Sequence, residues 1–391
     1  MTFRSFYADF HIHIGRTESG RPVKISGSRN LTFFNIVREA AERKGMDMIG
    51  LIDCHVPEVL AEMRRYLQDG ILQEQPDGGL KYKDMGIMIG SEIELKETGR
   101  KPFHVLVYLA TVEEMADFSE WMRPHMSNLT LSSQRLYVPA RTLQEEVSKR
   151  GGLFIPAHIF TPFKSVYGSA ADRISDVFDP SLIAAVELGL SADTVMASQL
   201  SELDRYPFLT NSDAHSLGKI AREYNRLRLK SASFNEWALA LKGLDGRRIE
   251  ANYGLNPRLG KYHLAFCRHC NAPLPSLTSF QCPACGGKNI VRGVEERIRQ
   301  IADRPPEAGN KRPPYLEQIP LEFIPGLGKK TLERLLDQFG TEMNILHRTP
   351  VEELERAVGS KIAGYIQLAR TGRLQIEEGG GGRYGKIADP T

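Results

Sequence analysis

Hydrophobic and polar positions follow two different rhythms along the first 250 residues. Apolar residues three or four positions apart predict amphipathic helices, and short apolar runs with polar borders predict buried strands. The predicted strands are Phe6–Ile12, Met48–Ile52, Gly86–Ile93, Phe103–Leu109, Gly152–Pro156, Leu182–Leu188, Pro207–Thr210 and Tyr224–Leu229. The predicted helices are Leu31–Lys44, Val56–Leu67, Val112–Met122, Ala140–Arg150 and Phe234–Lys242. This alternation indicates an α/β fold with a mainly parallel sheet, and the number of strand units favours a (β/α) barrel.

The pattern changes after residue 250 and predicts five parts of the chain. They are a barrel domain over 1–250, a small cysteine-containing module over 251–302, a linker over 303–320, a helical domain over 321–372 and a flexible tail over 373–391. The small module has little periodicity, so we expect something other than an apolar core to hold it. The linker is rich in proline, and the tail contains four consecutive glycines at 379–382.

Composition limits the possibilities without naming a function. The formal net charge is +3, from 51 Lys+Arg and 48 Asp+Glu, which is too small to indicate nucleic-acid binding by itself. Five cysteines in 391 residues do not suit a secreted disulfide framework, and no apolar run is long enough for a transmembrane helix. We therefore expect a cytoplasmic protein without a membrane partner.

Ionisable residues recur at the ends of the predicted strands. Asp9, His11 and His13 alternate with apolar neighbours, which places them on one face of a strand at its C-terminal end. Further candidates next to later strands are Asp53, His55, Glu92, Glu94, His104, His158, Glu187, Asp213 and His215. Barrel enzymes build their active sites at the C-terminal ends of the strands, so this recurrence predicts a single site.

The residue types at these strand ends indicate metal chemistry. Imidazole and carboxylate groups are ligands for Zn, Mn or Fe, and a set of this size suits two or three ions. Such ions lower the pKa of a bound water from about 15.7 to about 7 and stabilise the charge on a phosphate, so no serine or cysteine nucleophile is needed. The chain contains no G-x-S-x-G motif. Phosphoester hydrolysis is therefore the expected reaction.

These motifs resemble the polymerase-and-histidinol-phosphatase (PHP) family. The resemblance rests on H-x-H at 11–13, an Asp after the second strand, Gly90-Ser91-Glu92, His104, Ala157-His158 and Asp213-x-His215. It implies a distorted (β/α) barrel with a three-metal phosphoesterase site. The implied ligands are His11, His13, Asp53, Glu92, His104, His158, Asp213 and His215. Among them Glu92, Asp213 and His215 are also the expected catalytic residues, with Glu92 bridging two ions.

One position departs from the family pattern. Family members usually have Asp-His after the second strand, whereas this chain has Asp53-Cys54-His55. We favour Asp53 as the ligand, with His55 as the alternative if the loop lets it reach. Asp9 is expected to orient a histidine ligand rather than to bind metal. Glu94 and Glu187 are interpreted as charged residues at strand ends.

Four cysteines form two C-x-x-C pairs separated by 11 residues. The pairs are Cys267 with Cys270 and Cys282 with Cys285. Each pair brings two thiolates to one side of a tight turn, and two pairs complete a tetrahedron around zinc. Four cysteine ligands close a site to water, so we expect one structural zinc ion.

The segment from Leu321 to Leu332 resembles the helix-hairpin-helix of DNA-repair proteins. Pro325 ends one helix, and two glycines form a hairpin whose backbone N–H groups lie at the start of the next helix, where they bind a phosphate without reading a base. The residues expected to contact DNA are Gly326, Gly328, Lys329 and Lys330. Residues 335–363 fit a second, weaker hairpin. A generic pair of helices is the alternative interpretation.

The complete order of motifs over residues 1–370 resembles the endonuclease Q family. That family nicks DNA on the 5′ side of deaminated bases (uracil, hypoxanthine, xanthine) and of abasic sites. The resemblance implies DNA as the partner, either a lesion-containing duplex or a single strand, together with other replication or repair proteins at the nucleoid. It also implies two or three Zn, Mn or Mg ions in the barrel. The alternatives are a small-molecule phosphatase of the histidinol-phosphate type and a non-catalytic DNA-binding scaffold with a degenerate barrel.

Overall fold

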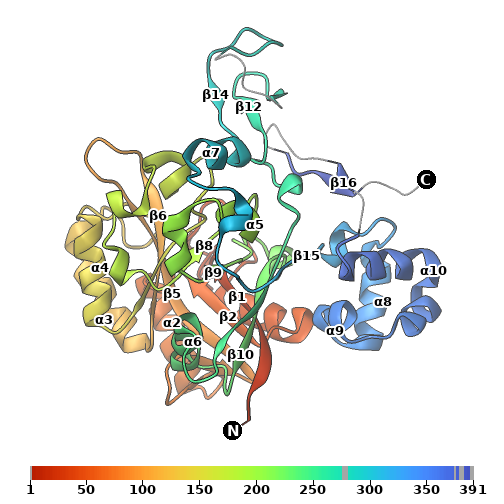
Figure 1. Cartoon of the computed structure of the whole chain (residues 1–391). Helices are drawn as coiled ribbons and strands as arrows, with labels where there is room; N and C mark the ends of the chain where they lie inside the picture. Colours follow the sequence, from red (N-terminus) through yellow and green to blue (C-terminus); the bar gives the residue numbers. More distant parts are fainter. Residues whose placement is uncertain (1, 275–280, 374–375, 378–382, 388–391) are drawn as a thin grey trace.

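A ten-stranded sheet runs through the centre of the molecule (Figure 1). The computed structural model describes residues 2–274, 281–373, 376–377 and 383–387. The sheet has the order β15-β11-β10-β1-β2-β5-β4-β3, and β6 and β7 branch from β5. Its strands are β1 (Arg4–Ile12), β2 (Met48–Ile52), β3 (Gln73–Glu74), β4 (Leu80–Tyr82), β5 (Met85–Leu95), β6 (Phe103–Leu109), β7 (Leu153–Pro156), β10 (Tyr224–Leu229), β11 (Arg248–Gly254) and β15 (Tyr315–Glu317).

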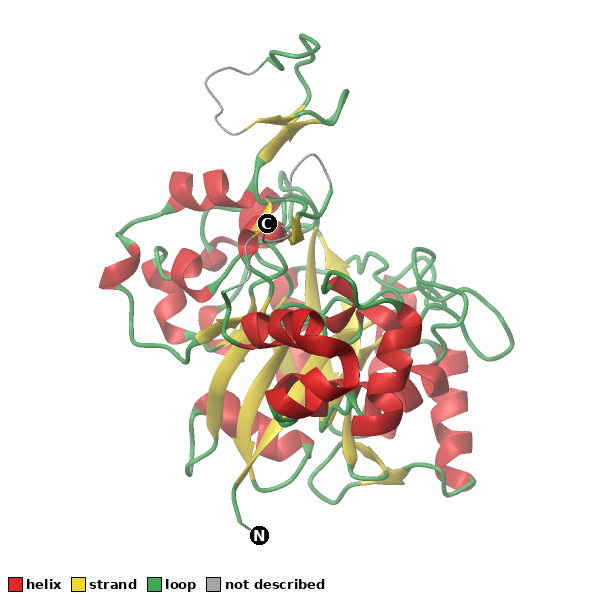
Figure 2. Ribbon diagram, turned by 90° about the vertical axis from the view of Figure 1, so that its right-hand side faces the viewer, coloured by secondary structure: helices red, strands yellow, loops and turns green. Residues whose placement is uncertain are grey.

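Helices pack against this sheet (Figure 2). They are α1 (Phe33–Arg38), which continues into the π-helix Glu39–Lys44, α2 (Pro57–Gln68), α3 (Val112–Met122), α4 (Ala140–Lys149), α5 (Thr194–Ala197) and α6 (Phe234–Lys242). Trp237 of α6 is buried against the sheet, and its ring stacks 4.0 Å from that of Phe10 on β1. The expected α/β fold class is confirmed.

The sheet is mixed, so the expectation of a mainly parallel sheet is wrong. β1 with β2 and β2 with β5 are parallel, whereas β5 with β6, β6 with β7 and β1 with β10 are antiparallel. A parallel crossover needs a dozen or more residues. The connection from Leu95 to Phe103 is shorter than that, so β6 must return antiparallel beside β5.

Beyond β7, two short strands and single backbone contacts connect the sheet back to β1. Strand β8 (Val186–Glu187) pairs in parallel with β9 (Phe208–Leu209). The N–H of Ala184 before β8 donates to the carbonyl of Phe154 in β7 at 2.9 Å, and Ala214 after β9 forms a bridge with Ile12 in β1. The strands therefore curve into a distorted barrel, and the ends of β1, β5, β8 and β9 meet.

The cysteine-containing segment projects from the barrel as a small sheet with the order β13-β12-β14 (Figure 1). Its strands are β12 (Ala265–Cys267), β13 (Pro273–Leu274) and β14 (Ile290–Val291). The following helix α7 (Val294–Ile301) returns to the barrel, where Arg297 donates to the carboxylate of Asp172 at 2.5 Å. The segment predicted as a linker lies along the barrel surface, because β15 pairs with β11 and Arg304 forms two 2.6 Å hydrogen bonds with Asp204.

The C-terminal helices form a separate layer beside the barrel (Figure 1). They are α8 (Lys329–Phe339), α9 (Glu342–His347) and α10 (Val351–Arg370), and α10 is kinked at Gly359, where φ is 80°. Beyond them, β16 (Ile376–Glu377) and β17 (Lys386–Ile387) pair antiparallel. Residues 374–375, 378–382 and 388–391 of the predicted flexible tail, which include its four glycines, lie outside the described residues. Among the described helices, none has the length and apolar character needed to cross a membrane.

Candidate metal centre

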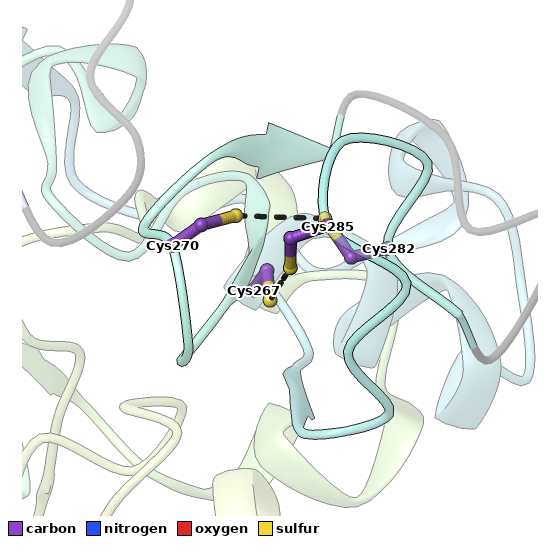
Figure 3. A group of neighbouring side chains, drawn as sticks. All are labelled: Cys267, Cys270, Cys282 and Cys285. Atoms are coloured by element: carbon purple, nitrogen blue, oxygen red, sulfur yellow. Dashed lines mark hydrogen bonds between the residues drawn. The ribbon is translucent and has the colours of Figure 1, made fainter.

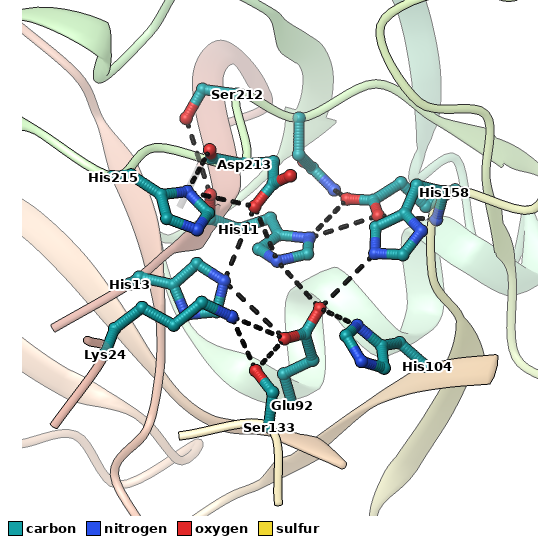
Figure 4. Close-up of polar contacts among 12 residues, drawn as sticks. His11, His13, Lys24, Glu92, His104, Ser133, His158, Ser212, Asp213 and His215 are labelled. Carbon is teal, nitrogen blue, oxygen red and sulfur yellow. Dashed lines mark hydrogen bonds and ion pairs between the residues drawn. The ribbon is translucent and has the colours of Figure 1, made fainter. Parts of the chain in front are cut away.

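Two histidines at the end of β1 lie at the centre of the site (Figure 4). Nε2 of His11 lies 3.6 Å from Oε1 of Glu92 and 3.5 Å from Oδ1 of Asp213. Nε2 of His13 lies 3.6 Å from Oε2 of Glu92 and 3.4 Å from Oδ1 of Asp213. Both histidines are fully buried. The alternating residues of β1 therefore meet carboxylates supplied by β5 and by the loop after β9.

Three overlapping groups of side chains could each hold one ion. Within each group the ligand atoms all lie within 4.8 Å of one another. The groups are His11, His13 and Glu92; His13, Asp213 and His215; and Glu92, His104 and His158. Glu92 belongs to two of the groups, and its carboxylate has two oxygens, so ions held in these groups would be adjacent, as in sites that bind both oxygens of a phosphoryl transfer. His13 has one free nitrogen and would bind an ion of only one group.

The hydrogen bonds of these histidines fit metal ligands. Nε2 of His11, His13 and His104 is buried and has no hydrogen-bond partner in the part of the chain that the structure describes. Nδ1 of His11 lies 2.9 Å from Oε1 of Glu187, and Nδ1 of His13 lies 3.0 Å from Oδ2 of Asp53. Leaving a buried nitrogen unpaired costs free energy, whereas a carboxylate behind the ring is the usual support of a metal-binding histidine. This pattern favours bound cations.

The structure does not bring Asp53 or His55 into the three groups. Oδ2 of Asp53 contacts the ring of His13 and accepts a hydrogen bond from the N–H of Ile14 at 2.9 Å. Nδ1 of His55 lies 2.7 Å from Oγ of Ser91. Asp53 as a metal ligand therefore stays a prediction, and its observed contact is with a histidine ligand candidate.

Asp9 supports the loop that carries Asp213. Its carboxylate accepts hydrogen bonds from the N–H groups of Ser212 at 3.0 Å and Ala221 at 2.9 Å. Burial raises the pKa of Asp9. The residue contacts backbone on both sides of Asp213, and it also accepts from the N–H of His11 at 3.4 Å, so its expected role in orienting a histidine ligand stays a prediction.

The sequence pattern did not predict that Glu187 contacts the central histidine His11. This buried carboxylate contacts His11, accepts from the N–H of His158 at 2.8 Å and accepts from Nδ2 of Asn211 at 2.8 Å. Its position after an apolar strand, like that of Glu92, was the available signal. Glu94 lies at the edge of the site, with Oε2 3.7 Å from Nε2 of His104.

Three residues of the site have unusual backbone conformations. Asp53, His158 and Asp213 have φ values of 135°, 29° and 46°. Residues other than glycine rarely adopt positive φ, and such strain persists only where the surrounding structure fixes it. These loops are therefore held in place to present their side chains.

The site concentrates negative charge. Burial by itself would raise the pKa of Glu92, but His104 and Lys24 outweigh it and hold that pKa well below its usual range. Burial would lower the pKa of His11, but Glu187 and Asp213 raise it to about 10. Lys24, which the sequence did not single out, places Nζ 3.1 Å from Oε2 of Glu92. The carboxylates thus stabilise positive charge on His11 and Lys24.

A cavity of about 580 Å³ lies beside the three groups. Glu92, Glu187 and Asp213 line its acidic part. The cationic residues that line it are Lys24, Lys164, Lys219, Arg222 and Lys261. A pocket with acidic residues on one wall and basic residues around it suits metal ions and a phosphate-bearing substrate together.

The four cysteines of the small module converge as the spacing predicts (Figure 3). Sγ of Cys267 lies 3.6 Å from Sγ of Cys285, and Sγ of Cys270 lies 3.6 Å from Sγ of Cys282. All four sulfur atoms lie within 4.8 Å of one another. This donor set fits one tetrahedral zinc ion.

The hairpin before α8 has the expected open backbone. Gly326 has a φ of 79°, and Gly328 is the N-cap of α8. A Cβ at Gly328 would meet no atom within 4 Å, so the backbone there is accessible. A cavity of about 460 Å³ is lined both by Gly326 and by Gly359, where α10 is kinked. The turn before α8 and the kink in α10 therefore lie side by side, with Lys329 and Lys330 on the first turn of α8.

Comparisons with known proteins place the chain in a family. No family model matches it. An uncharacterized protein of Bacillus subtilis (strain 168), YqxK, is 51% identical over 386 residues, which cover 98% of this chain and 99% of that protein. An uncharacterized protein of Methanocaldococcus jannaschii, MJ0043, is 39% identical over 249 residues, which cover 59% of this chain and 31% of that protein.

Two solved structures match almost the whole chain. The lesion-specific endonuclease PfuEndoQ of Pyrococcus furiosus has a TM-score of 0.84 and 32% identity over 99% of this chain and 96% of that one. A complex of Endonuclease Q with a 27-mer duplex substrate, with an abasic lesion at the active site, has a TM-score of 0.85 and 32% identity over 99% of this chain and 97% of that one. The fold, the site and these likenesses define an enzyme of the hydrolase class. The chain belongs to the endonuclease Q family.

Proposed function

We propose that this protein is a metal-dependent DNA-repair endonuclease that hydrolyses the phosphodiester on the 5′ side of a deaminated base or an abasic site. The observation that carries the proposal is the convergence of three overlapping ligand groups beside a cavity lined with basic residues. Family membership supports DNA as the substrate, since one relative was solved with an abasic duplex at its active site. Uracil, hypoxanthine and xanthine are the proposed deaminated bases.

The proposed mechanism assigns a task to each layer of the site. Divalent ions, when bound, supply a water of lowered pKa and offset charge on the phosphate. His11, His13, Glu92, His104, His158, Asp213 and His215 would hold these ions. Glu187 and Asp53 orient the two central histidines through Nδ1. Lys24 adds a cation beside Glu92, where it can pair with a phosphate oxygen of the substrate.

In this proposal, the other parts of the chain bind DNA and stabilise the fold. We assign one structural zinc ion to the four cysteines, because this small segment has few apolar residues to stabilise it. We assign Gly326, Gly328, Lys329 and Lys330 to contacts with DNA phosphates. Such contacts fix the register of the duplex without reading its sequence.

The test uses labelled duplexes of one sequence that carry a single deoxyuridine, deoxyinosine or abasic site, or no lesion, with Mn²⁺ or Mg²⁺. The proposed enzyme nicks the three lesion duplexes on the 5′ side and leaves the intact duplex whole. A small-molecule phosphatase would cleave none of them, and a non-catalytic scaffold would only shift their mobility.

A further inference from the structure

Residues 383–387, here called the C-terminal strap, lie beside the catalytic cavity although they come from the end of the chain. The N–H of Gly385 donates to the carbonyl of Leu259 at 2.9 Å. Strand β17 at the end of the strap pairs with β16, which lies against the turn Pro257–Leu259. These contacts bring Tyr384 into the lining of the same cavity as Glu92 and Asp213.

Two cations of the cavity lie against the ring of Tyr384. Cζ of Arg222 and Nζ of Lys261 each lie 5.8 Å from its centroid. Nη1 of Arg222 also donates to the hydroxyl of Tyr384 at 3.1 Å, and Nε of Arg222 donates to the carbonyl of Ser212 at 2.7 Å. The strap is therefore linked through Arg222 to the loop that carries Asp213.

The second tyrosine of the cavity is engaged by its own neighbours. The ring of Tyr262 meets Phe163 edge-on at 5.6 Å and stacks over Phe266 at 6.2 Å. The half-buried ring of Tyr384 has two cations beside it, although one of them, Lys261, lies closer to the ring of Tyr262, with Nζ 4.8 Å from that centroid. A flat ring flanked by cations matches a nucleotide, whose base stacks on an aromatic face while its phosphates pair with the cations.

We propose that Tyr384 is a specificity residue, which the C-terminal strap places in the catalytic cavity to stack on the base of the damaged nucleotide. Stacking stabilises the complex with a substrate that has a base, and it does not stabilise the complex with an abasic site. Tyr384 thereby sets the preference between the two kinds of lesion. This inference rests on the proposed endonuclease function.

The test compares the rate of nicking, as kcat/KM, on two duplexes of one sequence that carry either deoxyuridine or an abasic analogue. Base stacking on an aromatic ring is worth enough for Tyr384→Leu to lower the ratio of uracil to abasic rates roughly 10-fold. The matched variant Tyr384→Phe keeps the ring but loses the hydroxyl that Arg222 contacts, so its ratio stays at the wild-type value. Thermal unfolding of both variants checks that the fold is retained.

Each other outcome overturns the inference in a distinct way. If Tyr384→Phe and Tyr384→Leu slow both substrates equally, the residue only positions Arg222. A wild-type ratio in Tyr384→Leu would contradict stacking of the base on Tyr384. A wild-type enzyme that nicks abasic but not uracil duplexes would contradict it as well. A wild-type enzyme that nicks neither duplex would overturn the proposed function itself.

A fluorescence measurement gives a second readout without catalysis. In Tyr384→Trp, the introduced indole should be quenched more by the uracil duplex than by the abasic duplex when no Mn²⁺ is added. Equal quenching by the two duplexes would contradict stacking on this residue.

Discussion

Two carboxylates fix the direction in which the central histidines present their free nitrogens. Glu187 contacts Nδ1 of His11, and Asp53 contacts Nδ1 of His13, so that each Nε2 faces Glu92 and Asp213. A carboxylate behind a ligand also raises the basicity of the ring. At the scale of the residue, these two contacts hold both rings with Nε2 facing the same pair of carboxylates.

Replacement of Glu187 by Gln should weaken metal binding without unfolding the chain. The amide keeps the size of the side chain but loses the charge that orients His11, and loss of such a partner typically costs about 10–100-fold in metal affinity. We expect nicking by Glu187→Gln to need about 10–100-fold more Mn²⁺ and to recover at saturating Mn²⁺. The control is Glu120→Gln, at an exposed carboxylate. An unchanged Mn²⁺ requirement would contradict the orienting role.

Asp213→Asn should abolish nicking while DNA binding persists. Asparagine tolerates the φ of 46° at this position and keeps the shape of the side chain, so the loop should hold its conformation. Under the proposed function, the loss of the negative charge that faces Nε2 of His11 and of His13 should lower the rate at least about 100-fold. Activity within a few-fold of the wild type, measured beside the exposed control Asp84→Ala, would remove Asp213 from the site.

At the scale of the element, two short segments depend on local chemistry more than on the barrel. The sheet β13-β12-β14 has a small cluster of buried residues that includes Cys267 and Cys282 themselves. The hairpin before α8 depends on glycines, one of which has a positive φ. Each segment can therefore be tested by a substitution that leaves the barrel intact.

Cys282→Ser should release the proposed zinc ion and expose the segment that contains β12, β13 and β14 to protease. Small modules of this kind fold through their metal. Metal analysis and limited proteolysis measure the two effects, and Cys54→Ser is the control, because Cys54 is buried in the barrel apart from the cysteine group. A variant that keeps a full zinc equivalent in this segment and the wild-type digestion pattern would show that the ion is not structural.

Gly328→Val should weaken binding to damaged and intact duplexes alike. The new side chain meets no protein atom within 4 Å, and the φ of −72° suits any residue, so the fold should persist while the side chain blocks a phosphate. The affinity for DNA falls as the salt concentration rises, and the slope of log affinity against log salt is proportional to the number of phosphate contacts. This slope should therefore be shallower in the variant. Gly364→Ala, also in open space, is the control. A loss of lesion preference alone would instead assign the hairpin to base recognition.

At the scale of the whole molecule, the C-terminal helices dock on the barrel through charges and rings. Nζ of Lys44 lies 3.0 Å from Oε1 of Glu342, and Nζ of Lys219, a residue of the cavity, lies 2.5 Å from Oε1 of Glu322. His347 at the end of α9 stacks on Tyr7 of β1 at 4.6 Å. This docking fixes the distance between the proposed phosphate-binding hairpins and the metal groups.

The docking should weaken as the pH falls below about 6.5. Burial, together with Arg370, Arg226 and Arg348, lowers the pKa of His347 to about 4. Between pH 6.5 and pH 4 the unfolded chain therefore binds a proton that the folded chain excludes. The free energy of unfolding thus decreases as the pH is lowered through that range. Between pH 7 and pH 5 this residue should cost about 2 kcal/mol.

Thermal unfolding of His347→Gln at pH 7 and pH 5 measures this contribution. The variant should lose less stability than the wild type between the two pH values, whereas the control His269→Gln, at an exposed histidine, should behave as the wild type. Equal pH dependence in His347→Gln and the wild type would contradict a buried neutral imidazole at this interface.

Elements were predictable wherever the local pattern decided them. The predicted bounds of β2, β6, β10, α3 and α6 agree with the structure, because each is a short apolar run or an amphipathic helix with clear borders. The direction of β6 was not predictable from its own pattern, since pairing depends on the length of the connection and on distant strands. The predicted strand Leu182–Leu188 shortens to β8 because only Val186 and Glu187 find a partner in β9.

The sequence by itself determined which residues could bind metal, because alternation along β1 and the placement of His and Asp after apolar runs are local properties. It likewise determined the two cysteine pairs, because their spacing is a local property of the sequence. Only the tertiary structure decided which carboxylates stand behind the histidines and which residues enter the cavity. Glu187, Lys24 and Tyr384 are far from one another in sequence, and they meet at the site because the strands curve into a ring and the chain end returns to it.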